Sequence, residues 1–390
     1  MSASLWPVAI LAGGLAQRLG ELTRRQPKAL IDVNGEPFIA HQLRLLRANG
    51  AQRVVVCVGF LGDAIREAVG DGSAFDIALE YSCDGPQLLG TGGAIKKALP
   101  LLGENFLVIY GDSYLTCDYR QVQAAFLQHS DKLGLMTVLR NDGHWDQSNV
   151  EFVDGDILAY DKKAPSQRMR HVDYGLGVFK ATAFDDVPSG EPHDLARVYE
   201  RLVENNQLAA FEVSERFYEV GSLVGLAETR AYLAQRELEA LKQTLEDQQH
   251  LADALRDRAE AASARETELC AMLAQAREEL RRGNETIAEL RGISSNPREM
   301  SLLEERTRWA QRATADVAER DQTIHRLQNA LAEQTAWAQR SAAEVAHRDA
   351  IIRNLQASAR VSGALIERLT LLKRVLPGKL RSLITEHRPL

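Results

Sequence analysis

The 390-residue chain has few cysteines and no long hydrophobic run. Its four cysteines are scattered, without the Cys-x-x-Cys spacing of a zinc site or a redox motif. We therefore expect neither structural zinc nor a disulfide framework, and a reducing cytoplasm is the natural setting. No stretch reaches the roughly 18 consecutive apolar residues of a membrane span. The apolar run Val8–Ala12 is too short for a signal peptide and lacks a preceding basic region.

An excess of charge of one sign is also missing. The formal net charge of −7 is mild, and the 45% of apolar residues is typical of a globular protein. Because nucleic-acid binding proteins carry a basic surface, nucleic acid is not an expected partner.

Up to about residue 230, short apolar runs alternate with helical patterns. This alternation predicts an α/β fold with a mostly parallel sheet that is covered by helices on both faces. Asp154-Gly155 between two apolar runs is a hairpin signal, so the sheet is expected to be mixed. The predicted strands are Val8–Leu11, Val54–Val58, Ile77–Tyr81, Phe106–Tyr110, Leu133–Leu139, Val150–Val153 and Ile157–Tyr160, and the predicted helices are Phe38–Asn49, Gly62–Val69, Gly93–Leu102 and Tyr119–His129.

Beyond residue 230 the sequence indicates one long helical region. Apolar and small residues recur at alternating three- and four-residue steps from Leu238 to Leu290, which predicts an α-helical coiled coil. Glu266 and Gly283 are weak positions in this seam, and Gly292–Pro297 predicts a break in the helix.

The segment after the break contains an internal repeat. Trp309–Gln328 recurs as Trp337–Gln356 at an offset of 28 residues, which is four heptads and keeps the seam in register. The pattern favours a coiled coil that joins the chain into a homo-oligomer. A single amphipathic helix packed on the first domain is the alternative.

The composition divides the chain into five parts. In the last part, Lys and Arg outnumber Glu, and leucines share one helical face, as in helices that bind an anionic membrane surface or a partner protein. A solvated end to the coil is the alternative. The expected parts are a globular domain at 1–232, a coiled coil at 233–292, a break at 293–300, a coiled coil with the repeat at 301–358 and a basic amphipathic tail at 359–390.

The first predicted strand runs into the glycine turn Gly13-Gly14, followed by Arg18 and Lys28. Glycines at a strand-to-helix turn let backbone N–H groups approach phosphate, and two cationic side chains can neutralise it. An ordinary glycine turn is the alternative for the two glycines alone. The spacing matches neither the P-loop nor the dinucleotide-binding fingerprint.

Together with Arg18 and Pro27-Lys28, this stretch resembles the signature of sugar-phosphate nucleotidyltransferases. The Leu89–Ala94 loop, LGTGGA, resembles the loop of the mannose and heptose 1-phosphate guanylyltransferase branch. The resemblance implies a Rossmann-like fold of the nucleotide-diphospho-sugar transferase type. The other matching landmarks, in the family's order, are Gly35–Ile39, Tyr110–Ser113, Asp161-Lys162, Asp173–Gly175 and Phe217–Gly221.

The resemblance also implies a role for individual residues. It implies Mg²⁺ as cofactor, and a nucleoside triphosphate and a sugar 1-phosphate as substrates. The implied catalytic residues are Arg18, Lys28 and Lys162, the nucleotide-binding residues are Ala12, Gly13, Gly14, Gln87, Gly90, Thr91 and Gly92, the sugar-binding residues are Asp161, Gly175 and Asn149, and the metal ligands are Asp112 and Glu219.

Asp112 has a structural alternative, because an acidic residue after a strand is often a helix cap. Its place after a predicted strand favours a site, since α/β sheets bind ligands beyond the carboxyl ends of their strands. In the implied reaction, the substrate's own phosphate oxygen attacks the α-phosphorus and pyrophosphate leaves. No protein nucleophile is needed, so catalysis depends on positioning and charge neutralisation.

Four positions depart from the family pattern. Ala16 stands where glycine is usual, and Glu219 replaces the more usual aspartate and reaches one methylene further. Asp161 replaces glutamate and Asn149 stands where many members have glycine, so the identity of the sugar stays open.

The leading hypothesis is an enzyme that makes a nucleotide sugar from GTP, for surface polysaccharide synthesis. A cytidylyl- or uridylyltransferase acting on another phosphate ester is an alternative. A rival from another class is a catalytically quiet scaffold whose coil recruits glycan-assembly enzymes. The charged residues Arg18, Lys28, Asp112 and Lys162 favour an enzyme. We expect it in the cytoplasm, with a peripheral position at the inner face of the membrane as an alternative.

Overall fold

The computed structural model falls into two compact units, whose described residues lie up to Ala234 in the first and from Gln235 to Arg340 in the second, and each is described by itself. The described residues are 4–13, 27–59, 61–141, 143–293, 296–326, 328–330, 332–333, 336 and 340.

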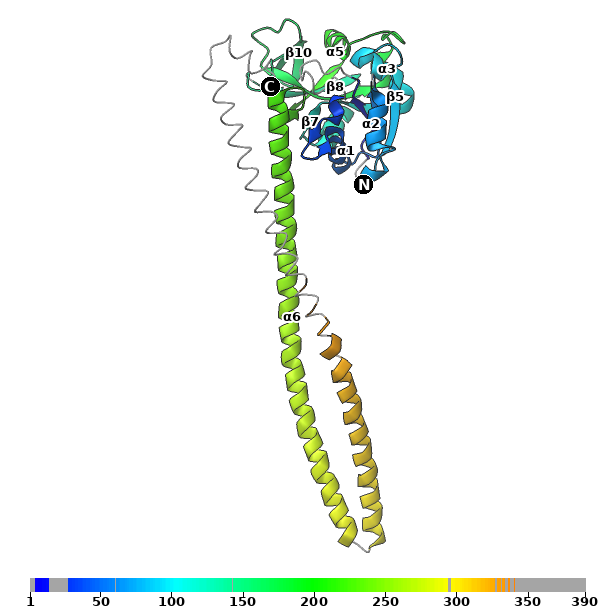
Figure 1. Ribbon diagram of the computed structural model, residues 1–390, viewed down its shortest axis with the longest axis vertical. Helices are drawn as coiled ribbons and strands as arrows, with labels where there is room; N and C mark the ends of the chain where they lie inside the picture. Colours follow the sequence, from blue (N-terminus) through cyan, green and yellow to red (C-terminus); the bar gives the residue numbers. More distant parts are fainter. Residues whose placement is uncertain are drawn as a thin grey trace, which may run out of the picture. The chain divides into compact units, whose positions relative to one another are not determined.

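A nine-stranded sheet with helices around it forms the centre of the first unit (Figure 1). Its main path runs β10-β9-β11-β6-β1-β4-β5, and β8 pairs with β11 and β12. The neighbours β6, β1, β4 and β5 are parallel, whereas β11 is antiparallel to β6 and β8, so the expected mixed sheet is confirmed. The strands are β1 (Val8–Leu11), β4 (Arg53–Val58), β5 (Ala78–Cys83), β6 (Asn105–Tyr110), β8 (Gly134–Arg140), β9 (Val150–Val153), β10 (Asp156–Tyr160), β11 (His171–Lys180) and β12 (Leu208–Val213).

The sheet is buried on both faces, as its continuous apolar strands predict. On β1, Val8 and Ile10 belong to one core, and Ala9 and Leu11 belong to the other. Buried residues of α1, α2 and α4 complete the first core, and those of α3 and α5 complete the second. These helices are α1 (Phe38–Ala48), α2 (Gly62–Val69), α3 (Gly90–Leu102), α4 (Tyr119–Leu127) and α5 (Leu195–Glu204), with 3-10 turns at Lys28–Leu30, Ser73–Phe75 and Ala181–Phe184.

The predicted hairpin at Asp154-Gly155 is present between β9 and β10. Both residues have positive φ, 53° and 98°, which is the backbone of a two-residue turn whose twist matches the strands.

Two short ladders lie outside the large sheet. β2 (Asp32–Val33) pairs with β3 (Glu36–Pro37), and β7 (Ser113–Leu115) pairs with β13 (Phe217–Glu219). The second ladder joins the end of β6 to the start of α6 (Leu223–Ile293). In the first unit, Leu226 and Leu233 of α6 belong to a third small core with Tyr114 and Val220. The boundary predicted at residue 232 therefore lies inside a helix.

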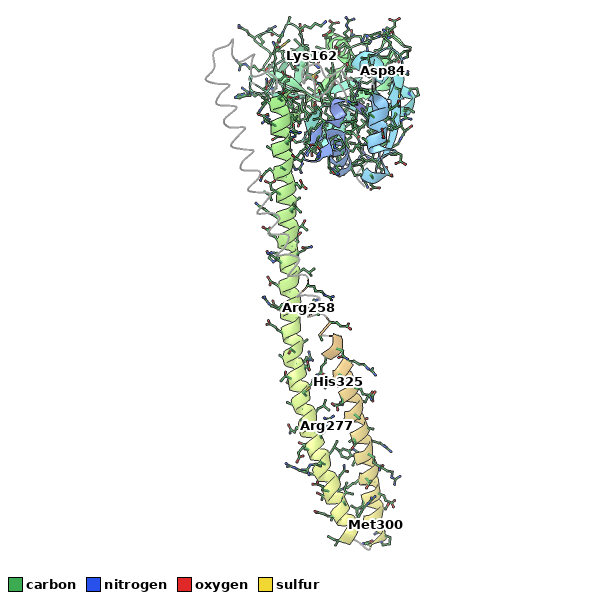
Figure 2. The ribbon with its side chains drawn as sticks, in the orientation of Figure 1. Asp84, Lys162, Arg258, Arg277, Met300 and His325 are labelled. Atoms are coloured by element: carbon green, nitrogen blue, oxygen red, sulfur yellow. The ribbon has the colours of Figure 1, made fainter. Side chains whose placement is uncertain are left out.

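The second unit is an antiparallel helical hairpin (Figure 1). α6 ends at Ile293, at the predicted break, and the chain is helical again over 297–326. Arg277 of α6, labelled in Figure 2, pairs with Asp321, and Gln328 donates a hydrogen bond to Glu266. The weak position Glu266 thus has a partner within the chain. Among the described helices, none is long and apolar enough to cross a membrane.

Candidate active site

The ends of β1 and β6 meet at the carboxyl edge of the sheet. The Gly111 N–H donates to Leu11 O at 3.0 Å, so the turns after the two strands touch. At Gly13 a Cβ would lie 3.1 Å from the backbone nitrogen of Gly59, which leaves little room for a side chain. The lack of a side chain at Gly13 thus allows the chain around Gly59 to come close, and the expected approach to phosphate stays a prediction. Two predicted site residues, Gly14 and Arg18, lie outside the described residues.

Gln42 of α1 fixes the turn that carries Asp112. Its side-chain nitrogen donates to the carbonyls of Tyr110 at 2.9 Å and Ser113 at 2.8 Å, one on each side of Gly111-Asp112. The side chain is almost fully buried. The sequence reading missed this residue, although a glutamine on the apolar face of a helix signals a buried hydrogen-bonding role.

Three charged side chains lie close together in what we call the carboxylate cluster: Lys28, Asp112 and Glu219. Lys28 Nζ lies 2.9 Å from Asp112 Oδ2. The β7–β13 ladder brings in Glu219, which lies opposite Ser113. A Cβ on Gly221 would meet all three groups: Glu219 Oε2 at 2.7 Å, Lys28 Nζ at 3.3 Å and Asp112 Oδ2 at 3.4 Å.

Burial raises the pKa of Glu219, and the charge on Asp112 raises it further. Hydrogen bonds from the Ser222 hydroxyl and the Gly221 N–H, with the charge on Lys28, act in the opposite direction. Paired carboxylates suit Mg²⁺, which takes one or two protein carboxylates and completes its shell with phosphate oxygens and water. Within the described residues, no group of three or more His, Cys, Asp or Glu side chains forms a metal site. Two carboxylates that converge beside a lysine match the protein donors that Mg²⁺ takes, and binding of the ion stays a prediction.

Lys162, labelled in Figure 2, forms a second charged pair with Asp173. Its Nζ lies 3.4 Å from Asp173 Oδ2, and it lies 5.3 Å from the centre of the Tyr110 ring. Burial disfavours the ammonium, but the charge on Asp173 and hydrogen bonds to Asp173 and Tyr110 outweigh it and raise the pKa of Lys162. Asp173 also accepts hydrogen bonds from the Tyr160 hydroxyl and the Gly175 N–H. Lys162 is therefore held as a cation.

The predicted sugar-side residues gather around Asp173. Asn149 Oδ1 accepts from the Asp173 N–H at 2.9 Å, and Asn149 O accepts from the Asp161 N–H at 3.0 Å. Asp161 Oδ1 closes a turn by accepting from the N–H groups of Lys163 and Ala164. Asn149 and Asp161 thus have structural bonds of their own, and their contact with a sugar stays a prediction.

The glycines of the LGTGGA loop lie at the start of α3. The N–H groups of Gly92 and Gly93 donate to His193 O, and Gly90 has a φ of 68° with His193 O 2.7 Å from where its Cβ would be. Thr91 Oγ1 donates to Asp194 Oδ1 at 3.0 Å. Here the glycines allow close approach by the chain around His193, so their contact with a base stays a prediction.

Gln87 lies just before this loop and lines an open pocket of about 330 Å³. Asp84, labelled in Figure 2, lines the same pocket, and its carboxylate accepts a hydrogen bond from Leu89 N at 3.0 Å. Leu89 and, from the middle of α3, Lys96 and Lys97 line it too, so a ligand there would contact Gln87 and these lysines.

A mixed sheet with a glycine turn and paired charges at its carboxyl edge defines a nucleotide-binding α/β enzyme. The Nucleotidyl transferase family model matches residues 8–236, more than half of the chain. The chain belongs to this family, as the sequence landmarks predict.

Several known proteins resemble the chain. The N-acetylmuramate alpha-1-phosphate uridylyltransferase of Neisseria meningitidis serogroup B is 29% identical over 226 residues, which are 57% of this chain and 96% of the relative. The D-glycero-alpha-D-manno-heptose 1-phosphate guanylyltransferase of Campylobacter jejuni is 31% identical over 114 residues, which are 29% of this chain and 51% of the relative. The crystal structure of HddC from Yersinia pseudotuberculosis, complexed with GMP-PN, supports the fold: its TM-score is 0.50 at 22% identity, and the match covers 59% of this chain and 100% of that one.

Proposed function

We propose that the chain joins a nucleoside triphosphate to a sugar 1-phosphate and releases pyrophosphate and a nucleotide sugar. The observation that carries this proposal is the pairing of Lys28 with Asp112 beside Glu219, at the edge of the sheet where the glycine turn approaches. Family membership supports the reaction class. The ammonium of Lys162, which Asp173 stabilises, would be a second phosphate-binding group.

An oxygen of the sugar phosphate forms a bond to the α-phosphorus, and the bond from that phosphorus to the β-phosphate oxygen breaks. Pyrophosphate leaves with the electron pair. Because both partners are anionic, the reaction needs cationic groups that bring them together and neutralise developing charge. Lys162 would orient the sugar phosphate, and Lys28 would bind triphosphate oxygens after exchanging Asp112 for phosphate.

Asp112 and Glu219 would hold Mg²⁺. When bound, the ion neutralises charge on the phosphate oxygens as a Lewis acid. Gln42 contributes by fixing the turn on which Asp112 stands.

GTP is the triphosphate that the LGTGGA loop favours. UTP is the second candidate, because the relative matched over 96% of its length is named as a uridylyltransferase. The names of the two relatives described above give N-acetylmuramate and a heptose as sugars, so these are the first candidates for the sugar phosphate. A role in surface polysaccharide synthesis is part of the proposal.

The test is a panel of four nucleoside triphosphates crossed with sugar 1-phosphates that include N-acetylmuramate, heptose and mannose 1-phosphate. Pyrophosphate release with GTP and one of these sugars is the expected result. Release with UTP or CTP alone would overturn the guanine assignment but keep the reaction class. Absence of release across the whole panel from a folded protein would leave the scaffold hypothesis standing.

A further inference from the structure

The first turns of α6 lie against Glu219. The Ser222 hydroxyl donates to Glu219 Oε1 at 2.6 Å and accepts from Gly225 N at 3.0 Å. The hydroxyl of Thr229, which is fully buried, lies 2.8 Å from the backbone oxygen of Glu219 and 2.8 Å from that of Gly225, and its proton can be donated to either. Residues at the start of this helix thus contact both the carboxylate and the main chain of Glu219.

Gly225 leaves the space that the Glu219 carboxylate occupies. A Cβ at position 225 would lie 1.9 Å from Glu219 Oε1, far inside van der Waals contact. Gly225 lies in the first turn of α6, where the absence of a Cβ makes room for this carboxylate. Gly283 in the same helix provides the contrast, because nothing lies within 4 Å of its Cβ position.

Side chains close to Glu219 in the sequence also contact α6. The ring of Tyr218 stacks on that of Tyr232 of α6, with 4.0 Å between ring centres. The guanidinium of Arg216 lies 4.8 Å from the centre of the Tyr218 ring and pairs with Glu228 of α6. The strand that carries Glu219 therefore cannot shift without disturbing the start of α6.

We infer that Ser222, Gly225 and Thr229 are positioning residues for Glu219, and that the start of α6 is part of the active site. A glutamate side chain has three rotatable bonds, so a free Glu219 would spend time turned away from Asp112 and Lys28. Groups that hold a metal ligand in one orientation contribute to metal affinity nearly as the ligands do. The inference rests on the proposed function, which makes Glu219 a metal ligand.

The first test compares Gly225→Ala with Gly283→Ala in the full chain, since the same substitution is made in the same helix. Mn²⁺ binding is measured by electron paramagnetic resonance with the triphosphate present, and turnover is measured at saturating substrates. Gly225→Ala is expected to weaken Mn²⁺ binding by about tenfold and turnover by about 100-fold, with Gly283→Ala unchanged in both. A folded Gly225→Ala protein with wild-type Mn²⁺ affinity and turnover would overturn the inference.

Two variants at Thr229 test the inference if Gly225→Ala does not fold. Thr229→Val removes the hydroxyl that lies beside Glu219 O, and Thr229→Ser keeps it. Thr229→Val is expected to weaken Mn²⁺ binding by about tenfold. Thr229→Ser is expected to bind Mn²⁺ as the wild-type protein does. Equal Mn²⁺ affinity in the two variants would contradict the inference. If the wild-type protein releases no pyrophosphate, the proposed function fails, and the Mn²⁺ comparison still decides whether these residues position Glu219.

Discussion

The two lysine–aspartate pairs of the candidate active site differ in which partner is the more exposed. In the carboxylate cluster, the side chain of Lys28 is 21% exposed and that of Asp112 is 32% exposed. In the second pair, Lys162 is 40% exposed, whereas Asp173 is only 2% exposed. The first pair thus presents its carboxylate to a ligand, and the second presents its ammonium. An open carboxylate suits a metal ion, and an open ammonium held by a buried carboxylate suits a phosphate.

Asp112→Asn tests the first half of this comparison and carries the largest expected effect. The substitution removes the charge with little change in size, so turnover is expected to fall by about a thousandfold because metal-assisted charge neutralisation is lost. Pyrophosphate release at saturating Mg²⁺ is the measurement. Asp154→Asn, at an exposed turn, is the matched control and should behave as wild type. Near wild-type turnover in a folded Asp112→Asn protein would remove Asp112 from the metal site.

Lys162→Met tests the second half. The kcat/KM for the sugar phosphate is expected to fall by about 100-fold, mainly through a higher KM, because one phosphate-binding cation is lost. The KM for the nucleoside triphosphate should change little. A rise in the triphosphate KM alone would place Lys162 at the wrong substrate.

Asp173→Asn tests whether Asp173 affects the reaction only through Lys162. If Asp173 acts only by holding Lys162, the variant should lose about tenfold in efficiency, and adding Lys162→Met should cost less than it does in the wild-type background. Pyrophosphate release from the two single variants and the double variant gives this coupling. Fully additive losses would show that Asp173 does not act through Lys162.

Leu303→Ala carries the smallest expected effect on the reaction. Leu303 is buried in the helical hairpin, so the change is expected to lower the hairpin's stability by about 2–3 kcal/mol. Turnover should stay at the wild-type value, because the chemical groups lie in the first unit. Thermal unfolding followed by circular dichroism, with turnover measured in parallel, checks both parts. A loss of turnover at a temperature where the first unit is folded would connect the hairpin to catalysis.

The homo-oligomer stays a prediction for the second unit. The hairpin covers part of the seam within one chain, but Leu269, Met272, Leu290 and Trp309 remain exposed. Such side chains favour association of a second copy. Sedimentation at micromolar concentration is expected to show a mass above that of one chain, and a monomer would contradict the prediction.

The sequence predicted the central strands β1, β4, β6 and β8 because each reads as a largely apolar run that is buried on both faces. It did not predict β11, β12 or α5. Helix Gly62–Val69 and strand Val8–Leu11 were predicted to the residue. The start of α6 was missed, because the residues after Glu219 contain two glycines and precede the regular coiled-coil pattern. The fold-back of the hairpin was not predicted either, since a heptad seam can pack against its own chain or against a partner chain.

Within the site, the sequence predicted the residues that carry charge but not those that hold them. Lys28, Asp112 and Glu219 are far apart in the chain, and only the family landmarks indicated that they meet. The roles of Gln42 and Thr229 depend on contacts made after folding, and each residue belongs to a helix whose pattern signals only packing. Asp173 stood within a recognised landmark, yet its role as the buried partner of Lys162 appears only in three dimensions.

The most direct test of the account is the amount of pyrophosphate released with and without the sugar phosphate. In the proposed reaction the sugar phosphate is the nucleophile. Pyrophosphate and nucleotide sugar should therefore form in equal amounts, and the triphosphate alone should release no pyrophosphate. A burst of one pyrophosphate per chain in the absence of sugar phosphate would contradict it, because the nucleotide would then have been transferred to the protein itself.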